Sequence, residues 1–330
     1  MVRRAGISII INCPGRLRFG FMCRQARLFS TIRNVGFIGL GQMGRRMVKN
    51  ILKSRKLEKL TVFDSHKAAV EVFQHEAVSA SGLKDFTDSD AVFLMLPTGE
   101  SVSDVLFARD GLINFLRKGA VVVNSGTIGV NCSKEIEKEL GNLNIKFVDA
   151  PVSGGTIGAE NATLTFMVGG CNKTIQSLET IFLTMGKRVV QCGDVGKGQA
   201  AKICNNMLLA ITMLGAAETF ALARKMGLDP KLLTDIINTS SGRCWVTEVN
   251  NPVPGIVESS PASQDYQVGF SSQLILKDIR LAIEEAALSH LDLTELKSCE
   301  HQFSNMIANE NVFASKDMSV VYQYLIKSSK

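Results

Sequence analysis

Lys202 and Asn206 lie four residues apart in a stretch without proline that runs from Gly198 to Met226. At that spacing two side chains share one face of a helix. A lysine amine can take the proton of an alcohol if burial or a nearby positive charge lowers its pKa, and an asparagine can orient that alcohol. A lysine at a helix edge is also commonly solvated. Gly196 and Gly198 favour the chemical role, because glycines weaken the first turn of a helix unless a ligand must approach it closely.

Three glycines with dinucleotide-binding spacing follow an apolar run near the start of the chain. In G-x-G-x-x-G the first glycine permits a tight turn, the second admits a pyrophosphate, and the third lets the helix pack close to the strand. The N-terminus of the following helix then directs its N–H groups at the phosphates. The residues predicted to bind a dinucleotide here are Gly39, Leu40, Gly41, Gln42, Met43 and Gly44.

An aspartate ends the second predicted strand, twenty positions after the last of these glycines. Asp64 can accept hydrogen bonds from the adenosine ribose and would repel a 2′-phosphate, so it predicts NAD as the cofactor. An alternative is that Asp64 caps the helix that follows it. Lys67 keeps NADP open as a second possibility.

Three further predicted strands, at 91–96, 120–124 and 145–148, end in polar or glycine-rich segments. In open α/β sheets ligands bind beyond the carboxyl ends of the strands. After the third of these strands a hydroxyl and bare backbone N–H groups could bind a carboxylate, although a plain turn is an alternative. The residues concerned are Ser153, Gly154 and Gly155.

The elements that must position these residues follow a βαβ rhythm. The predicted strands are Val35–Ile38, Leu60–Phe63, Ala91–Leu96, Ala120–Asn124, Ile145–Val148, Leu164–Val168 and Arg188–Gln191. They are apolar without strict alternation, as buried parallel strands are, and helix-like segments separate them. The sequence therefore predicts an α/β fold whose N-terminal part is a Rossmann-type doubly wound sheet.

From Gly196 onward the sequence predicts an all-α region, with helices at 198–226, 230–239, 272–289, 292–309 and 316–327. We expect an NAD-binding domain over 32–195 and a helical domain for substrate binding and dimerisation over 196–330. Broad helical faces need burying, which predicts a homo-oligomer, a dimer or tetramer. The segment 240–265 is long for a structureless loop, which suggests a functional role.

The first 34 residues contain seven arginines and no acidic residue, whereas the whole chain has a net charge of +6. Residues 1–31 therefore resemble a mitochondrial transit peptide and predict a matrix location; a secretory signal and a disordered extension are alternatives. The rest of the chain is close to neutral, so no nucleic-acid partner is expected. No apolar run reaches the length of a membrane span, and neither the eight cysteines nor the four histidines show metal-binding spacing.

Taken together, the motifs resemble the β-hydroxyacid dehydrogenase family from about Asn34 to the C-terminus. Besides the glycine motif they comprise Asp149–Gly155, Gly196-x-Gly198-x-x-x-Lys202-x-x-x-Asn206, Ser240–Trp245 with Asn251–Gly255, and Lys277-Asp278. The resemblance implies that Lys202 is the catalytic lysine, and that Asn206, Ser153 and Gly154 hold the substrate. It implies contacts with NAD from Leu96, Pro97, Ser101, Thr127 and Lys277.

The sequence departs from the family pattern at a few positions. Gly126, Gly129 and Val130 stand where the family usually has a second serine and an aspartate–proline pair, and Ser101 replaces a frequent asparagine. The resemblance implies NAD-dependent oxidation of 3-hydroxyisobutyrate to methylmalonate semialdehyde, a step of valine degradation. Reduction of a related small semialdehyde, succinic or tartronate, is an alternative, as is a non-catalytic NAD-binding assembly protein.

Overall fold

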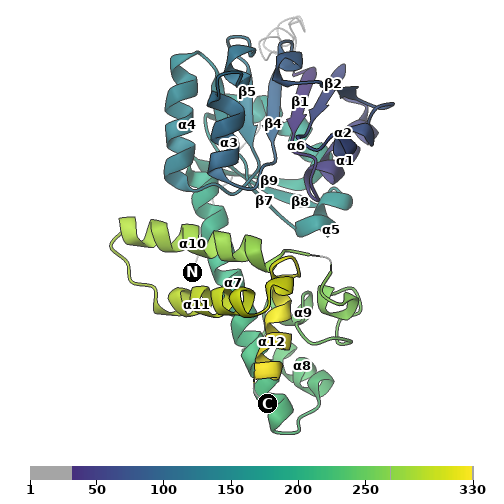
Figure 1. Ribbon diagram of the computed structural model, residues 1–330, viewed down its shortest axis with the longest axis vertical. Coiled ribbons are helices and arrows are strands. Elements are labelled where there is room, and N and C mark those ends of the chain that lie inside the picture. The colour runs from purple at the N-terminus through teal and green to yellow at the C-terminus, as the bar shows by residue number, and fades with distance from the viewer. Residues whose placement is uncertain (1–31, 268, 329–330) are drawn as a thin grey trace, which may run out of the picture. The chain divides into compact units, whose positions relative to one another are not determined.

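The computed structural model describes residues 32–267 and 269–328. The predicted transit peptide lies outside these residues. Nine strands form one sheet, which helices cover on both faces (Figure 1). The strands are β1 Asn34–Ile38, β2 Lys59–Phe63, β3 Val78–Ser79, β4 Ala91–Leu94, β5 Val121–Asn124, β6 Lys146–Asp149, β7 Val152–Ser153, β8 Leu164–Gly169 and β9 Gly186–Gly193.

The strand order is β3-β2-β1-β4-β5-β6-β8-β7, with β9 also paired to β8. The first six strands in this order are parallel, which confirms the predicted α/β class. The sheet is not parallel throughout, however, because β8 pairs antiparallel with both β6 and β7. The order reverses between β1 and β4, so the crevice for a ligand is expected beyond the ends of these two strands.

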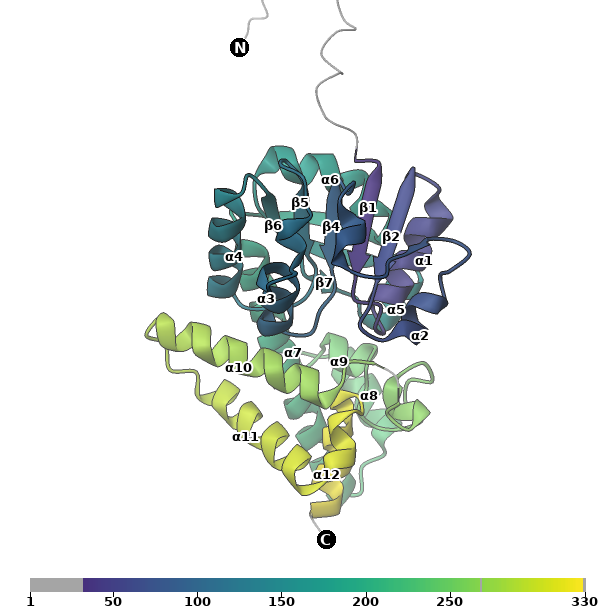
Figure 2. The same cartoon turned by 45° about the horizontal axis from the view of Figure 1, so that its top comes forward.

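The strands are apolar on both faces because each face packs against helices. Phe93 of β4 lies in one core cluster, which includes residues of the helices α1 Gly44–Ser54 and α6 Asn172–Met185. Its neighbour Val92 lies in a second cluster, with residues of α3 Gly99–Phe107 and α4 Val130–Asn142. Two short helices, α2 Lys67–Glu71 and α5 Gly155–Glu160, complete this part of the chain (Figure 2).

The long helix α7 Lys197–Lys225 is the centre of the helical part and measures about 44 Å. The helices α10 Ser272–Leu288, α11 Thr294–Asn309 and α12 Val321–Ser328 pack against it (Figure 1). Within the described residues, α7 is the one helix long and apolar enough to cross a membrane, a test that core helices also pass. Here Phe220 of α7 lies in a core cluster with Ile279 and Phe303.

The segment 240–265 is packed rather than structureless. It follows α8 Pro230–Asn238 and contains α9 Trp245–Glu248 and a 3-10 turn at Pro261–Gln264. Asn251 is fully buried, and its side-chain oxygen accepts a hydrogen bond from the Val253 N–H at 3.0 Å. The length of the segment is therefore explained in part by its own folded structure, and its functional role stays a prediction.

The start of α7 is attached to the end of β6 through one buried carboxylate. Asp149 Oδ1 accepts the N–H of Gly196 and Oδ2 accepts that of Gln199, both at 2.8 Å. A Cβ atom on Gly198 would overlap the carbonyl oxygen of Met167 and lie 2.7 Å from Asp149 Oδ2. Gly198 is therefore required by the sheet, so this glycine is not by itself evidence that a ligand lies against the turn.

Replacing Gly198 by alanine should destabilise the protein, because neither the Met167 carbonyl nor the Asp149 carboxylate can move away from a new methyl group. We expect Gly198→Ala to lower the free energy of unfolding by about 2 kcal/mol or more. Gly141→Ala, at an exposed position of α4, is the control, because nothing lies within 4 Å of a Cβ there. It should raise the free energy of unfolding by about 0.5–1 kcal/mol. Equal effects in urea denaturation would contradict this explanation.

Candidate active site

Lys202 is half-buried, on the second turn of α7. Desolvation by the surrounding protein lowers its pKa to about 8. The negative charge of Asp278 opposes this shift, and the positive charge of Lys277 adds to it. An amine with this pKa exchanges protons readily near neutral pH, which a general acid or base requires.

Asn206 is buried one turn further along α7, with 1% of its surface exposed. Its Nδ2 atom donates a hydrogen bond to Asp278 Oδ2 at 2.6 Å, and its Oδ1 atom accepts one from Asn205 Nδ2 at 3.1 Å. A carboxylate can only accept hydrogen bonds, so Asp278 fixes which end of the amide faces it. One of the two Nδ2 hydrogens remains for an acceptor atom on a ligand.

Lys277 contacts Thr127, another of the predicted cofactor residues. Its Nζ atom donates to the carbonyl oxygen of Thr127 at 2.5 Å and lies 2.9 Å from Asp278 Oδ1. The helix α10 therefore contacts both the loop after β5 and, through Asp278, the helix that carries Lys202 and Asn206. The structure thus brings Thr127, Lys277 and Asn206 into one polar network.

The loop after β5 lies against the end of β4. A Cβ atom on Gly126 would overlap the carbonyl oxygen of Leu96, so the glycine that departs from the family pattern is required by this backbone. The hydroxyl of Ser125 is buried without a hydrogen-bond partner in the part of the chain that the structure describes. Such a group is normally satisfied, so the Ser125 hydroxyl is available for a hydrogen bond with a bound ligand.

The glycine motif has the geometry that a pyrophosphate needs. Gly39 has a φ of +98°, and a Cβ atom on Gly44 would overlap the Gly39 carbonyl. Gly41 has nothing within 4 Å of such an atom, so packing within the chain does not require this glycine. The first turn of α1 has neither a side-chain cap nor an acidic residue, which leaves it suited to an anion. These features fit a dinucleotide.

Asp64 accepts hydrogen bonds from the backbone N–H groups of Leu40, at 2.6 Å, and of His66, at 2.8 Å. Burial opposes its ionisation, but the hydrogen bonds from His66 and Leu40 outweigh it and lower its pKa. Asp64 is therefore a carboxylate at neutral pH, attached to the glycine loop. The capping alternative is not supported, because α2 begins at Lys67 with His66 as its N-cap and without a side-chain cap hydrogen bond.

The remaining predicted residues lie at the ends of neighbouring elements. Ser153 is half-buried and pairs with Thr165 of β8, whereas Gly154 and Gly155 are exposed at the start of α5. Within the described residues no hydrogen bond joins Ser153 to Lys202 or Asn206. The hydroxyl of Ser101 lies 2.8 Å from that of Thr98, at the start of α3, and Leu96 and Pro97 precede it.

The sequence assigned no role to two buried residues of this region, Asp149 and Gln199, although Asp149 opens the Asp149–Gly155 motif. Asp149 is the last residue of β6, and an acidic residue at the end of an apolar strand is a signal that could have been used. Gln199 gave no such signal, because its partners lie more than 70 positions away in the chain.

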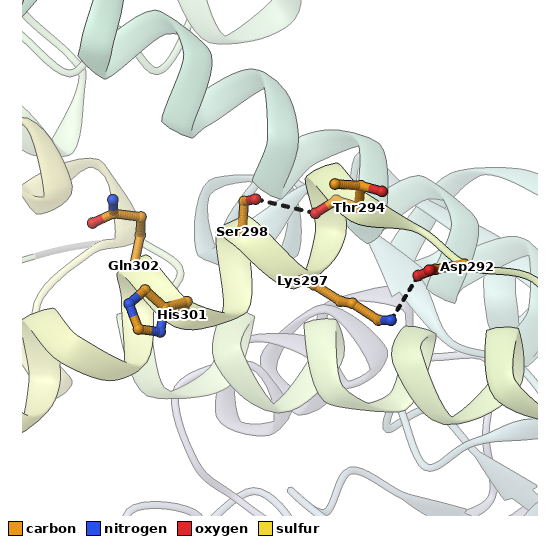
Figure 3. Close-up of a pocket in the computed structure, with 6 residues that line it drawn as sticks. All are labelled: Asp292, Thr294, Lys297, Ser298, His301 and Gln302. Atoms are coloured by element: carbon orange, nitrogen blue, oxygen red, sulfur yellow. Dashed lines mark hydrogen bonds and ion pairs between the residues drawn. The ribbon is translucent and has the colours of Figure 1, made fainter.

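A separate hollow of about 440 Å³ lies at the start of α11 (Figure 3). Lys297 Nζ and Asp292 Oδ1 are 2.6 Å apart across it, so its charges are paired with each other. It contains none of the predicted site residues. In residues 32–267 and 269–328 no group of three or more His, Cys, Asp or Glu side chains could hold a metal ion. The residues that line the hollow at the start of α11 are Asp292, Thr294, Lys297, Ser298, His301 and Gln302.

Comparison with known proteins matches nearly the whole chain. The family model for the NAD binding domain of 6-phosphogluconate dehydrogenase matches residues 34–193. A second family model, for the NAD-binding region of NADP-dependent 3-hydroxyisobutyrate dehydrogenase, matches residues 196–325. The mitochondrial 3-hydroxyisobutyrate dehydrogenase of Homo sapiens is 40% identical over 94% of this chain and 92% of its own. The Mus musculus enzyme is 41% identical over 88% of this chain and 86% of its own.

A solved structure is similar over the same range. Mycobacterium tuberculosis 3-hydroxyisobutyrate dehydrogenase, described with L-serine, is 34% identical and superposes with a TM-score of 0.81. The match covers 89% of this chain and 99% of that chain. Imine reductases from Myxococcus stipitatus and Bacillus cereus share the fold at 15–18% identity.

The charges around Lys202 predict how its amine titrates. We expect its pKa to be about 8, and we expect Asp278→Asn to lower it, because the substitution removes a negative charge that favours the ammonium form. The measurement is ¹⁵N NMR of the lysine side chains, with the resonance assigned by its loss in Lys202→Met. Titration of Lys202 near the ordinary value, or an unchanged pKa in Asp278→Asn, would contradict the electrostatic account.

Proposed function

Because the chain belongs to the 3-hydroxyisobutyrate dehydrogenase family of NAD-dependent oxidoreductases, we propose that it oxidises 3-hydroxyisobutyrate to methylmalonate semialdehyde, a step of valine degradation. The observation that carries the proposal is the amine of Lys202, with a pKa lowered to about 8, one helical turn from the buried amide of Asn206. We assign residues 32–195 to NAD binding, and residues 196–330 to substrate binding and self-association.

In the proposed mechanism Lys202 is the general base. Oxidation of a primary alcohol removes the hydroxyl proton and a hydride from the same C–O unit. Bound NAD supplies the hydride acceptor. The neutral amine of Lys202 takes the proton and becomes an ammonium ion. The negative charge of Asp278 favours that ion, because it raises the pKa of Lys202. In the reverse direction the ammonium returns the proton to the aldehyde oxygen.

The substrate carboxylate and hydroxyl need hydrogen-bond donors. We assign the hydroxyl of Ser153 and the backbone N–H groups of Gly154 and Gly155 to the carboxylate; both glycines are exposed, with φ values of +129° and +60°. The remaining amide hydrogen of Asn206 is assigned to the substrate hydroxyl, since the other one is bonded to Asp278. Initial rates measured with several 3-hydroxy acids, and with succinic and tartronate semialdehyde, will show which of these compounds is the preferred substrate.

We assign NAD to the glycine motif, Asp64 and the residues around the ends of β4 and β5. The lowered pKa of Asp64 supports NAD over NADP, because a carboxylate at the ribose repels a 2′-phosphate. Ser101 is placed in this group by its position at the start of α3, although its hydroxyl is already paired with Thr98. The assigned set is Gly39, Leu40, Gly41, Gln42, Met43, Gly44, Asp64, Leu96, Pro97, Ser101, Thr127 and Lys277.

We also assign self-association to the helical part. Leu208 and Leu222 of α7 are each 63% exposed, and Leu232 of the adjacent α8 is 51% exposed. Large apolar side chains gathered on exposed helices are typical of protein–protein contacts. A second copy of the chain is the occupant that the proposal requires, in a dimer or tetramer.

Lys202→Ala tests the proposed base. We expect kcat with 3-hydroxyisobutyrate and NAD to fall by at least about a hundredfold, roughly 2.7 kcal/mol of transition-state stabilisation, while NAD affinity changes little. Lys202→Arg should not restore activity, because a guanidinium stays protonated. Lys197→Ala, at an exposed position of the same helix, is the control and should keep wild-type kcat. The mechanism is wrong if folded, NAD-binding Lys202→Ala keeps more than about a tenth of kcat.

We propose the mitochondrial matrix as the location, since the Homo sapiens and Mus musculus relatives are mitochondrial and residues 1–31 are rich in arginine and lack acidic residues. We expect removal of this segment, with a mature N-terminus near Thr31. N-terminal sequencing of protein isolated from mitochondria is the measurement. An intact Met1 in that protein would contradict the proposal.

A further inference from the structure

Gln199 is a polar side chain with none of its surface exposed, three residues before Lys202 on α7. Burying an amide costs free energy unless its donor and acceptor atoms find partners. The partners of Gln199 therefore indicate what the residue does. All of them belong to segments distant in the chain.

Both ends of the Gln199 amide bind the loop after β5. Its Oε1 atom accepts the N–H of Ile128 at 3.1 Å, and its Nε2 atom donates to the carbonyl of Gly126 at 2.9 Å. The side chain therefore binds the backbone on either side of Thr127. The N–H of Gln199 is itself bonded to Asp149, so the start of α7 is attached to β6 and to this loop at the same point.

The other side of the loop is bound from α10. Lys277 Nζ donates to the Thr127 carbonyl at 2.5 Å, and its neighbour Asp278 bonds to Asn206 of α7 at 2.6 Å. The contacts form a closed circuit: Gln199, the loop 126–128, Lys277–Asp278 and Asn206. Lys202 lies on α7 between Gln199 and Asn206, the two residues of this helix that belong to the circuit. The position of Thr127 relative to Lys202 is thus set by hydrogen bonds from two helices.

We propose that Gln199 is a positioning residue that holds the loop 126–128, and with it the cofactor contact Thr127, in register with Lys202. The proposal rests on the proposed function, in which Thr127 contacts NAD and Lys202 takes the substrate proton. Hydride transfer needs reacting atoms about 3–3.5 Å apart, and a shift of about 1 Å can cost a hundredfold in rate. An amide suits the task because one of its ends donates and the other accepts.

Two variants of Gln199 test the proposal. Gln199→Met keeps the length of the side chain and removes both hydrogen bonds. Gln199→Asn keeps the amide but is one methylene shorter, so it cannot reach both loop groups; it carries the test if the methionine variant does not fold. Thr234→Val is the control. It removes the buried hydroxyl that donates to the Pro230 carbonyl at 2.8 Å, on α8, which lies at the opposite end of α7 from the sheet (Figure 1).

Three readouts separate positioning from general destabilisation. Without cofactor, amide hydrogen exchange in residues 124–130 should speed up by about tenfold or more in the Gln199 variants and stay unchanged in Thr234→Val. The Kd for NADH, from its fluorescence, should rise by about threefold or more. With 3-hydroxyisobutyrate, kcat should fall by about tenfold or more, and the deuterium isotope effect on kcat should increase, because hydride transfer becomes slower than product release.

The exchange and binding measurements do not depend on the identity of the substrate. If the wild-type protein oxidises no 3-hydroxy acid, the proposed function fails, and faster exchange with weaker NADH binding still supports the role of Gln199. Folded Gln199 variants with wild-type exchange in residues 124–130 overturn the inference, whatever their activity. So do variants whose losses are matched by Thr234→Val in every readout, because the effect would then be one of stability alone.

Discussion

The buried carboxylate of Asp149 determines where the rest of the site can be. It accepts the N–H groups of Gly196 and Gln199, and it thereby fixes the point and direction in which α7 leaves the sheet. Burial raises the pKa of Asp149 against the effect of these hydrogen bonds, whereas the positive end of the α7 dipole favours the carboxylate. Because α7 is 29 residues long, a small rotation at its first turn would displace Asn206 and the residues that follow it on the helix. The absence of a side chain at Gly198 is what lets the sheet and the helix approach this closely.

Opposing charges act on Lys202, the proposed base. Burial alone disfavours the ammonium, but the site also needs a carboxylate, Asp278, to orient the amide of Asn206. That carboxylate favours the ammonium form. Lys277 lies 2.9 Å from Asp278, and its positive charge acts on Lys202 in the opposite direction. Lys277 therefore limits the effect of Asp278 on the pKa of Lys202. The Nζ atom of Lys277 also binds the loop after β5. The Lys277-Asp278 pair is adjacent in sequence, which keeps the two opposing effects together.

Much of the fold could be predicted from the sequence because its signals are local. Buried strands such as Val121–Asn124 are continuous apolar runs, and the 3.6-residue period of α7 is unbroken by proline. Helical spacing likewise predicted that Lys202 and Asn206 share α7. The antiparallel turn of β8 back onto β6 and β7 was not predicted, because strands of two residues such as Val152–Ser153 leave no periodic pattern. The loop groups that bind the side chain of Gln199, and Asp278, which binds Asn206, lie more than 70 positions away, and one sequence shows no signal of such a pairing.

Gly126 illustrates how a departure from a family pattern can preserve a site. A serine side chain at this position would overlap the carbonyl of Leu96, so the loop reaches its present distance from β4 only with glycine. The carbonyl group of Gly126 accepts hydrogen bonds from two buried side-chain amides, those of Asn124 and Gln199. Asn124 donates to its carbonyl at 3.0 Å, and Gln199 donates to the same oxygen at 2.9 Å. In this chain the loop is thus held through its backbone by one residue of β5 and one of α7. Because Gln199 lies three residues before Lys202 on α7, the contact that holds Gly126 also ties the loop to the helix that carries Lys202.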